Sequence, residues 1–202
     1  MKKYSLSSDI REKVYGFIFT LSIILSTAAT LLFNILVQDH AVDNIGVLYL
    51  NIFILPTVGG INLGLKWLFD NYLWDKKIFA KIIQVQNLSG EWSIEGESST
   101  GDTYGGTLHI KQTFSEILIK GVFLKSTSFN EETFLSLRNN EIVLSYYYLN
   151  ELKNKEDGMT THHGFIKITF DLLNMKAEGK YFTDDFRKTQ GHWSLEKNIR
   201  NN

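Results

Sequence analysis

The sequence predicts a membrane α-helical hairpin followed by an all-β domain, an antiparallel up-and-down barrel of about eight strands. Two long uncharged runs near the N-terminus predict the hairpin. Short alternating segments after residue 87, separated by Gly, Asn and Asp turns, predict the barrel. We therefore divide the 202 residues into a two-helix transmembrane region with a cytoplasmic connector over 1–86 and a β-barrel domain over 87–202.

The two uncharged runs cover residues 15–37 and 44–65. At about 1.5 Å per helical residue, each is long enough to cross a hydrocarbon core of roughly 30 Å. A cleavable signal peptide has a shorter apolar region, and here a second run follows the first after the short turn 38–43. The pair is therefore interpreted as two transmembrane helices.

Lysine and arginine residues flank the hairpin on one side only. Lys2, Lys3 and Arg11 precede or open the first run, Lys66 and Lys76 follow the second, and the connecting turn has neither residue type. Because positively charged flanks stay on the cytoplasmic side, both termini are expected to be cytoplasmic.

Small residues recur at helix-interface spacing in both runs. Ser22 and Ser26 form a stripe in the first, and Gly60 and Gly64 form one in the second. Such stripes let helix backbones approach closely. The pattern fits packing between the two helices of one subunit and packing between subunits equally well.

The all-β domain contains eight segments rich in β-branched and aromatic residues. The predicted strands are 88–97, 104–113, 117–125, 133–138, 142–150, 164–171, 176–184 and 189–197. Alternation assigns one face of each strand to the barrel interior.

Several inward rows change from aliphatic to polar toward one end of the barrel. These polar positions are Tyr146, Tyr148, Asn150, Tyr181, Thr183, Arg187 and Thr189. An eight-stranded barrel can be packed solid or hold one small ligand. The polar cup predicts a ligand site, because ligands favour barrel mouths, although tyrosines that cap a packed core would give the same pattern.

Composition excludes several other functions. The absence of cysteine excludes disulfides, thiolate nucleophiles and Cys-based metal sites, and acidic residues outnumber basic ones in 87–202, which argues against nucleic-acid polymers. His162 and His163 lack the partners of a metal site. No catalytic set can be assembled, so we expect a binding domain, without metal or cofactor, and no enzyme.

The order of segments resembles a known family, the two-transmembrane, β-strand-rich effectors of bacterial CBASS antiphage systems, which have a β-barrel cyclic dinucleotide receptor domain. The matching segments are the helical hairpin, Leu-Ser-Gly-Glu-Trp at 88–92, Ile-Lys-Gln-Thr-Phe at 110–114, Ser126 and Ser128, 144–150, His163-Gly164, 178–183 and 187–191. Each is weak alone, and their order carries the resemblance.

The resemblance implies a function. A cognate nucleotidyltransferase would make a cyclic dinucleotide, the barrel would bind it, and the helices would assemble and disrupt the bacterial inner membrane, which kills the infected cell. The partners expected are this ligand, the bilayer and further copies of the chain. The candidate ligand-binding residues are Tyr146, Tyr148, Arg187, Thr189, Thr183, Ser126, Ser128 and Gln112, since Arg pairs with phosphate and Tyr stacks on bases.

Two other functions fit the same residues. A membrane-anchored, lipocalin-like module could bind a small apolar ligand, with the helices acting only as an anchor. A scaffold with a fully packed barrel could bind a protein on its outer face. A cavity that is apolar throughout would favour the first, and a barrel without a cavity would favour the second.

Overall fold

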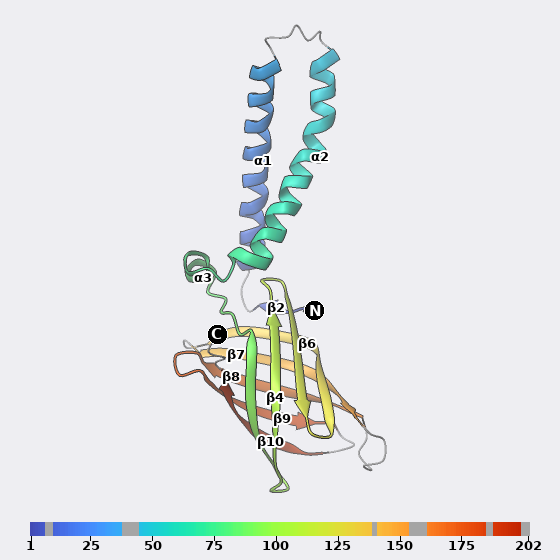
Figure 1. Ribbon diagram of the computed structural model, residues 1–202, viewed down its shortest axis with the longest axis vertical. Helices are drawn as coiled ribbons and strands as arrows, with labels where there is room; N and C mark the ends of the chain where they lie inside the picture. The colour runs from blue at the N-terminus through green and yellow to red at the C-terminus, as the bar shows by residue number, and fades with distance from the viewer. Residues whose placement is uncertain (7–9, 38–44, 139–140, 154–160, 185–187, 199–202) are drawn as a thin grey trace. The chain divides into compact units, whose positions relative to one another are not determined.

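The chain forms two compact units in the computed structural model, which describes all residues except 7–9, 38–44, 139–140, 154–160, 185–187 and 199–202 (Figure 1). One unit combines Met1–Ser8 with Gln84–Asn202, and the other is Asp9–Ile83. The first eight residues therefore belong with the strands, although the sequence places them directly before a helix.

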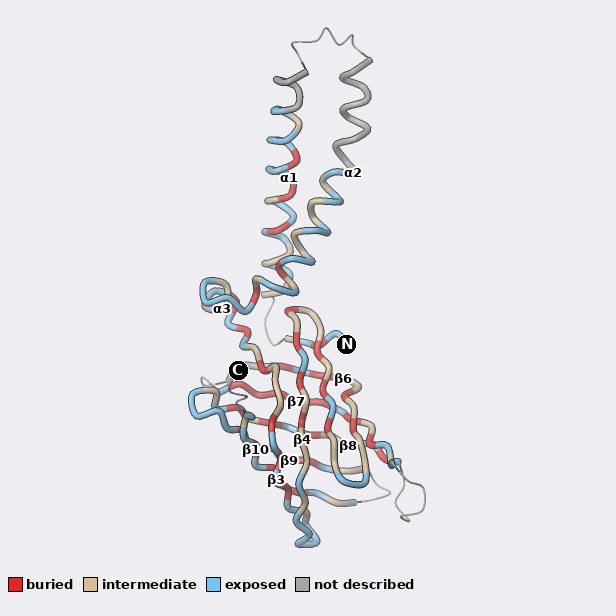
Figure 2. Tube along the Cα trace, viewed as in Figure 1, coloured by how far each residue is buried: buried red, intermediate tan, exposed pale blue. Residues whose placement is uncertain are grey.

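Eight strands close into an antiparallel up-and-down barrel, as the alternation predicts. They are β3 (Gly90–Ser98), β4 (Thr103–Gln112), β5 (Glu116–Phe123), β6 (Ser126–Arg138), β7 (Glu141–Leu152), β8 (His162–Asp171), β9 (Lys176–Thr183) and β10 (Gln190–Lys197). Each strand pairs with its neighbours in sequence, β10 pairs with β3, and a β5–β6 pairing completes the hydrogen-bonded ring. Buried and exposed residues alternate along these strands (Figure 2).

Strand β6 is the element that differs most from its prediction. It begins at Ser126, where the sequence predicts a start at residue 133, and its pairing with β7 shifts register between Asn130 and Thr133. The buried Asn130 spans this irregularity, since its Oδ1 accepts from the Ile119 amide at 2.8 Å and its Nδ2 donates to Thr133 Oγ1 at 3.0 Å. A bulge in the middle of a strand hides its first half from a period-two search.

A short N-terminal segment fills the seam between β5 and β6. These strands pair directly only at Lys120–Val122. Beyond that point β1 (Lys2–Lys3) pairs with β5, and β2 (Ser5–Leu6) runs parallel to β6. The N-terminal segment thus supplies hydrogen-bonding partners to strand edges that would otherwise be open.

Tyr4, between these two short strands, closes one end of the barrel. Its side chain is 2 % exposed, and its hydroxyl donates to the Phe114 carbonyl at 2.9 Å. Gln112 lies beside it, with Nε2 donating to the Gln86 carbonyl at 3.2 Å and Oε1 accepting from the Leu88 amide at 2.9 Å. We call this region, where β4 ends and β5 begins, the closed end.

The other unit contains α1 (Ile10–Val37), α2 (Ile45–Leu68), the π-helical turn η1 (Phe69–Leu73) and α3 (Lys77–Ile83). In the part of the chain that the structure describes, one segment, Ile10–Leu32, has the length and apolar character needed to cross a membrane. The predicted turn 38–43 lies outside the described residues, as do the side chains in the first half of α2.

The two small-residue stripes have different surroundings within this unit. Ser22 and Ser26 are buried, and they bond to α2 through Asn62 Nδ2 at 3.3 Å and Thr57 Oγ1 at 3.2 Å, respectively. Gly60 and Gly64 are exposed, and a Cβ built on either would have no described atom within 4 Å. The serine stripe therefore joins α1 to α2, and the glycine stripe faces away from described neighbours.

Candidate functional site

A cavity of about 480 Å³ lies inside the barrel at the end opposite Tyr4. It is formed where β3, β5, β7 and β9 end and where β4, β6, β8 and β10 begin, and we call this region the open end. Aromatic rings make one part of its wall: Tyr104, Phe123, Tyr148, Tyr181 and Trp193. Gly105 and Leu124 also line it, and the remaining groups are hydroxyl, amide, imidazole and charged: Ser98, Thr100, Asp102, Thr103, Lys125, Ser126, Ser128, Asn150, His162, Thr183 and Thr189.

The aromatic wall is held together by ring contacts and one central hydrogen bond. Trp193 Nε1 donates to the Tyr104 hydroxyl at 2.9 Å. The Tyr181 ring lies 5.9 Å from Trp193 and 6.4 Å from Tyr104, centroid to centroid. Burial, and then the hydrogen bond with Tyr181, raise the pKa of Tyr104 far above its usual value. The Tyr104 phenol therefore stays neutral, and its oxygen accepts the hydrogen bond from the indole N–H.

Glycines on the inner face leave room for these rings. A Cβ at Gly164 would collide with the Tyr148 ring, and one at Gly191 would lie 2.6 Å from the ring of Tyr181. Phe123 similarly covers Gly106, where a Cβ would meet its ring at 2.5 Å. The aromatic side chains can therefore lie flat against neighbouring strands, and space remains at the centre of the open end.

A polar row crosses three adjacent strands, β6, β7 and β8, beside the Tyr148 ring. Ser128 of β6 pairs with Asn150 of β7, which in turn pairs with His162 of β8. All three side chains are buried and line the cavity. Ladder pairing fixes their backbones side by side, so the row presents a hydroxyl, an amide and an imidazole at one level of the barrel.

Two threonines complete the rim between β9 and β10. Thr183 Oγ1 accepts from the Thr189 amide at 2.8 Å and lies 3.1 Å from Thr189 Oγ1. The reciprocal backbone bond, from the Thr183 amide to the Thr189 carbonyl, is 2.9 Å. The hydroxyls are thus held in place by the hairpin backbone.

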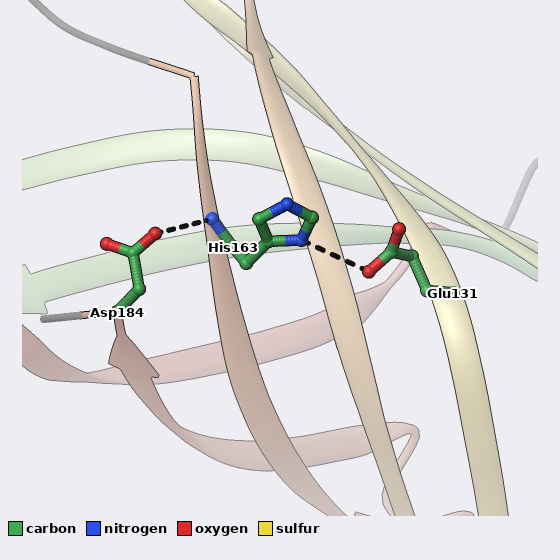
Figure 3. A network of polar contacts seen from close by, with 3 residues as sticks. All are labelled: Glu131, His163 and Asp184. Atoms are coloured by element: carbon green, nitrogen blue, oxygen red, sulfur yellow. Dashed lines mark hydrogen bonds and ion pairs between the residues drawn. The ribbon is translucent and has the colours of Figure 1, made fainter. Parts of the chain in front are cut away.

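A second polar network braces the same end from outside (Figure 3). The His163 amide donates to Asp184 Oδ2 at 3.0 Å, and its Nδ1 lies 3.2 Å from Glu131 Oε2. His163 points outward, whereas His162 points into the barrel. The two histidines therefore lie on opposite faces of β8, and among the described residues no cluster of His, Asp and Glu could hold a metal ion.

The predicted ligand-binding residues fall into three groups. Tyr148, Thr183, Thr189, Ser126 and Ser128 come together around the cavity. Tyr146 is buried deeper, below Tyr148 with their ring centroids 6.5 Å apart, and Gln112 belongs to the closed end. Arg187 lies outside the described residues.

Three prominent wall residues were not among these candidates. Asn150 and Trp193 occupy inward positions that the alternation predicts, and Asn150 also belongs to the polar cup. Tyr104 is the first residue of the predicted strand 104–113, and in the structure it is the second residue of β4. An aromatic residue paired with a glycine across strands, as Tyr104 is with Gly96, is a signal that could have identified it.

Comparison with known proteins adds two findings. Residues 83–197 match the family model described as Cap15, cyclic dinucleotide receptor domain. The chain is also 34% identical over 151 residues to a protein of Yersinia aleksiciae named CD-NTase-associated protein 15, an alignment that covers 72% of this chain and 71% of the relative. The family match spans the whole barrel, including every strand that forms the cavity.

Proposed function

The chain belongs to the family of Cap15 cyclic dinucleotide receptor proteins, and from this we propose that it is a CBASS antiphage effector whose barrel binds a cyclic dinucleotide in the cavity of the open end. Binding would trigger assembly of the helices and disruption of the inner membrane, with abortive infection as the result. The observation that carries the proposal is the cavity that combines aromatic rings with a row of hydrogen-bonding groups.

The chemistry of the cavity suits such a ligand. Tyr148, Tyr181 and Trp193 offer faces on which bases can stack. Lys125, the two rim threonines and Ser126 offer charge and donors for phosphate, and Arg187 is proposed to join them because its guanidinium can pair with phosphate bidentately. A volume of about 480 Å³ lies within the usual range of small-molecule sites. The receptor role requires no catalytic step.

The polar row argues against the lipocalin-like alternative. An apolar ligand would leave the buried Oδ1 of Asn150, which has no hydrogen-bond partner among the described residues, without solvent or a new partner, at a cost in free energy. A scaffold with a solid barrel is likewise disfavoured by the cavity itself. We therefore propose the cyclic dinucleotide receptor function alone.

The pairing of the N-terminal segment supports a two-helix hairpin. Lys2–Lys3 and Ser5–Leu6 pair with β5 and β6, so the chain before α1 lies in the same compartment as the barrel that follows α3. A chain that leaves a compartment and returns to it crosses the membrane an even number of times. If Ile10–Leu32 crosses once, we propose that α2 provides the return, and the lysine-rich flanks support a cytoplasmic location for both termini.

The outer surfaces of the helices fit lipid or further subunits. Large apolar side chains on α1 are exposed: Phe17, Phe19, Ile23, Ile24, Leu25, Leu31, Leu32 and Ile35. On α2 the exposed stripe of Gly60 and Gly64 would allow a neighbouring backbone to approach. We propose that this stripe packs between subunits when the ligand is bound.

Calorimetry on the full chain in detergent tests the receptor function. A panel of cyclic dinucleotides with uracil, adenine and guanine bases should include at least one tight ligand, and Tyr148→Ala or Arg187→Ala should weaken it at least tenfold while the melting temperature stays near that of the wild type. Absence of binding across the panel would refute the receptor function. Unchanged affinity in either variant would remove that residue from the site.

A membrane-potential assay tests the effector function. Co-expression with a cognate cyclic dinucleotide synthase should depolarise the inner membrane, whereas a catalytically inactive synthase should not. Cells that stay polarised with the active synthase would contradict the proposed output and leave ligand binding as a separate result.

Cysteine labelling tests the topology. The chain has no cysteine of its own, so a single introduced cysteine is the one thiol that can react. In intact cells a membrane-impermeant maleimide should modify Asp39→Cys in the connecting turn and leave Ser99→Cys on the barrel unmodified. Labelling of both or of neither would contradict the hairpin.

A further inference from the structure

Asn150 carries a buried hydrogen-bond acceptor that the protein itself does not satisfy. The residue is 7 % exposed and lines the cavity, and its Oδ1 has no hydrogen-bond partner among the described residues. Leaving such an acceptor buried and unpaired costs free energy in the folded protein. A polar group kept at this cost beside a cavity indicates a partner that arrives from outside the chain.

The strand pairing fixes the backbone of Asn150 at one place in the cavity wall. It is the central member of the polar row, paired with Ser128 on one side and with His162 on the other. Tyr148, two residues earlier on the same face, places an aromatic ring next to it. A side chain on a strand of a closed barrel is better fixed than one on a loop, and a fixed amide can select among ligands.

We propose that Asn150 reads the edge of one base of the bound cyclic dinucleotide, and this inference rests on the receptor function proposed above. Its Oδ1 accepts a base N–H, and its Nδ2 donates to the ring nitrogen or carbonyl oxygen next to that N–H. An asparagine amide has the spacing for this bidentate contact with a nucleobase. The neighbouring tyrosine then stacks on the base whose edge is read.

The two buried asparagines of the barrel allow a matched comparison. Asn130 is 2 % exposed, and its Oδ1 and Nδ2 bond to Ile119 and Thr133 within the protein. Asn150 should behave in the opposite way. Asn150→Leu removes an unsatisfied acceptor, so the melting temperature should stay level or rise, whereas the affinity for the preferred cyclic dinucleotide should fall at least tenfold. Asn130→Leu should lower the melting temperature and leave the affinity unchanged.

The experiment measures both variants and the wild type, as full chains in detergent, by thermal unfolding and by calorimetry with the same three-base panel. We expect Asn150→Leu to keep its stability and to lose affinity. We also expect it to distinguish less between cyclic dinucleotides that differ in their bases. A lower melting temperature with unchanged affinity would overturn the proposal, because Asn150 would then be structural.

Two further outcomes are distinguishable. If Asn150→Leu does not fold, the same measurements are made on Asn150→Ser. Unchanged affinity and unchanged base preference in that variant would overturn the inference, and a loss of either would support it. If the wild type binds no member of the panel, the receptor function fails and this inference fails with it. If the wild type binds and Asn150→Leu binds equally well, only the reading of the base by Asn150 fails.

Discussion

The two ends of the barrel are built from the same eight strands but treat buried polar groups in opposite ways. At the closed end Gln112 uses its carbonyl and its amide on partners within the chain, and Tyr4 seals the end with a hydrogen bond to Phe114. At the open end the Oδ1 of Asn150 has no described partner and faces a cavity. Satisfied groups hold the closed end together, and an unsatisfied acceptor that borders a cavity marks where a ligand is expected.

Each end also has one buried tryptophan, and the two tryptophans have different neighbours. Trp92 is fully buried, donates to the Leu88 carbonyl at 3.2 Å and packs against Phe170 with ring centroids 4.9 Å apart. Trp193 lines the cavity and donates to Tyr104. Substitutions at the two ends should therefore separate stability from affinity.

The largest effect is expected from Trp92→Ala. Replacing a fully buried tryptophan by alanine should lower the free energy of unfolding by about 3–5 kcal/mol, because it removes apolar contacts and leaves a cavity. Urea denaturation monitored by circular dichroism measures the loss. A decrease under about 1 kcal/mol would mean that the closed end is not the packed core described here.

The next effect is expected from Gln112→Leu. The Leu88 amide and the Gln86 carbonyl would lose their partner, so stability should fall by about 1–3 kcal/mol, while ligand affinity should stay within error of the wild type. Denaturation and calorimetry on one preparation give both values. Lost affinity with intact stability would return Gln112 to the ligand site, as the candidate list drawn from the sequence has it.

Trp193→Leu should show the opposite pattern at the open end. Loss of a stacking surface should weaken ligand binding by about 1–3 kcal/mol, or roughly five- to 150-fold. The melting temperature should fall less than in Trp92→Ala, because the residue borders a cavity on one side. Equal stability losses in the two tryptophan variants would contradict the proposed division between a stabilising closed end and a ligand-binding open end.

The smallest effect is expected from Tyr4→Phe. The ring still fills the closed end, but the Phe114 carbonyl loses its donor, so stability should fall by about 1 kcal/mol. Amide hydrogen exchange should rise in residues 1–6 before it rises elsewhere in the barrel. Exchange that rises uniformly would indicate that the N-terminal segment opens only when the whole barrel unfolds.

The sequence was sufficient for the barrel and for the location of the polar cup. Period-two alternation identifies which residues point inward, and the inward rows of β7 and β9 place Tyr148 and Thr183 at the same end. Alternation does not identify the partner of a polar side chain. The partners of Gln112 are Gln86 and Leu88, more than twenty residues earlier, so the sequence did not distinguish Gln112 from a residue that faces the cavity.

The N-terminal strands could not be predicted for a related reason. Lys2–Lys3 and Ser5–Leu6 are too short for any periodicity to register, and each is a strand only because β5 and β6 leave open edges along the seam. Their structure depends on the tertiary fold. The same holds for Tyr104, whose inward position is settled by the glycine opposite it.

The position of Tyr4 also sets an order of events during synthesis. Tyr4 is made before its partner Phe114, which follows 110 residues later, after α1, α2 and α3. Because chains fold from the N-terminus as they are made, the helices can form before the barrel can close. The contact between Tyr4 and Phe114 is therefore available only once the helices and the first two strands of the barrel have been made, and it joins the two ends of a long insertion in the sequence.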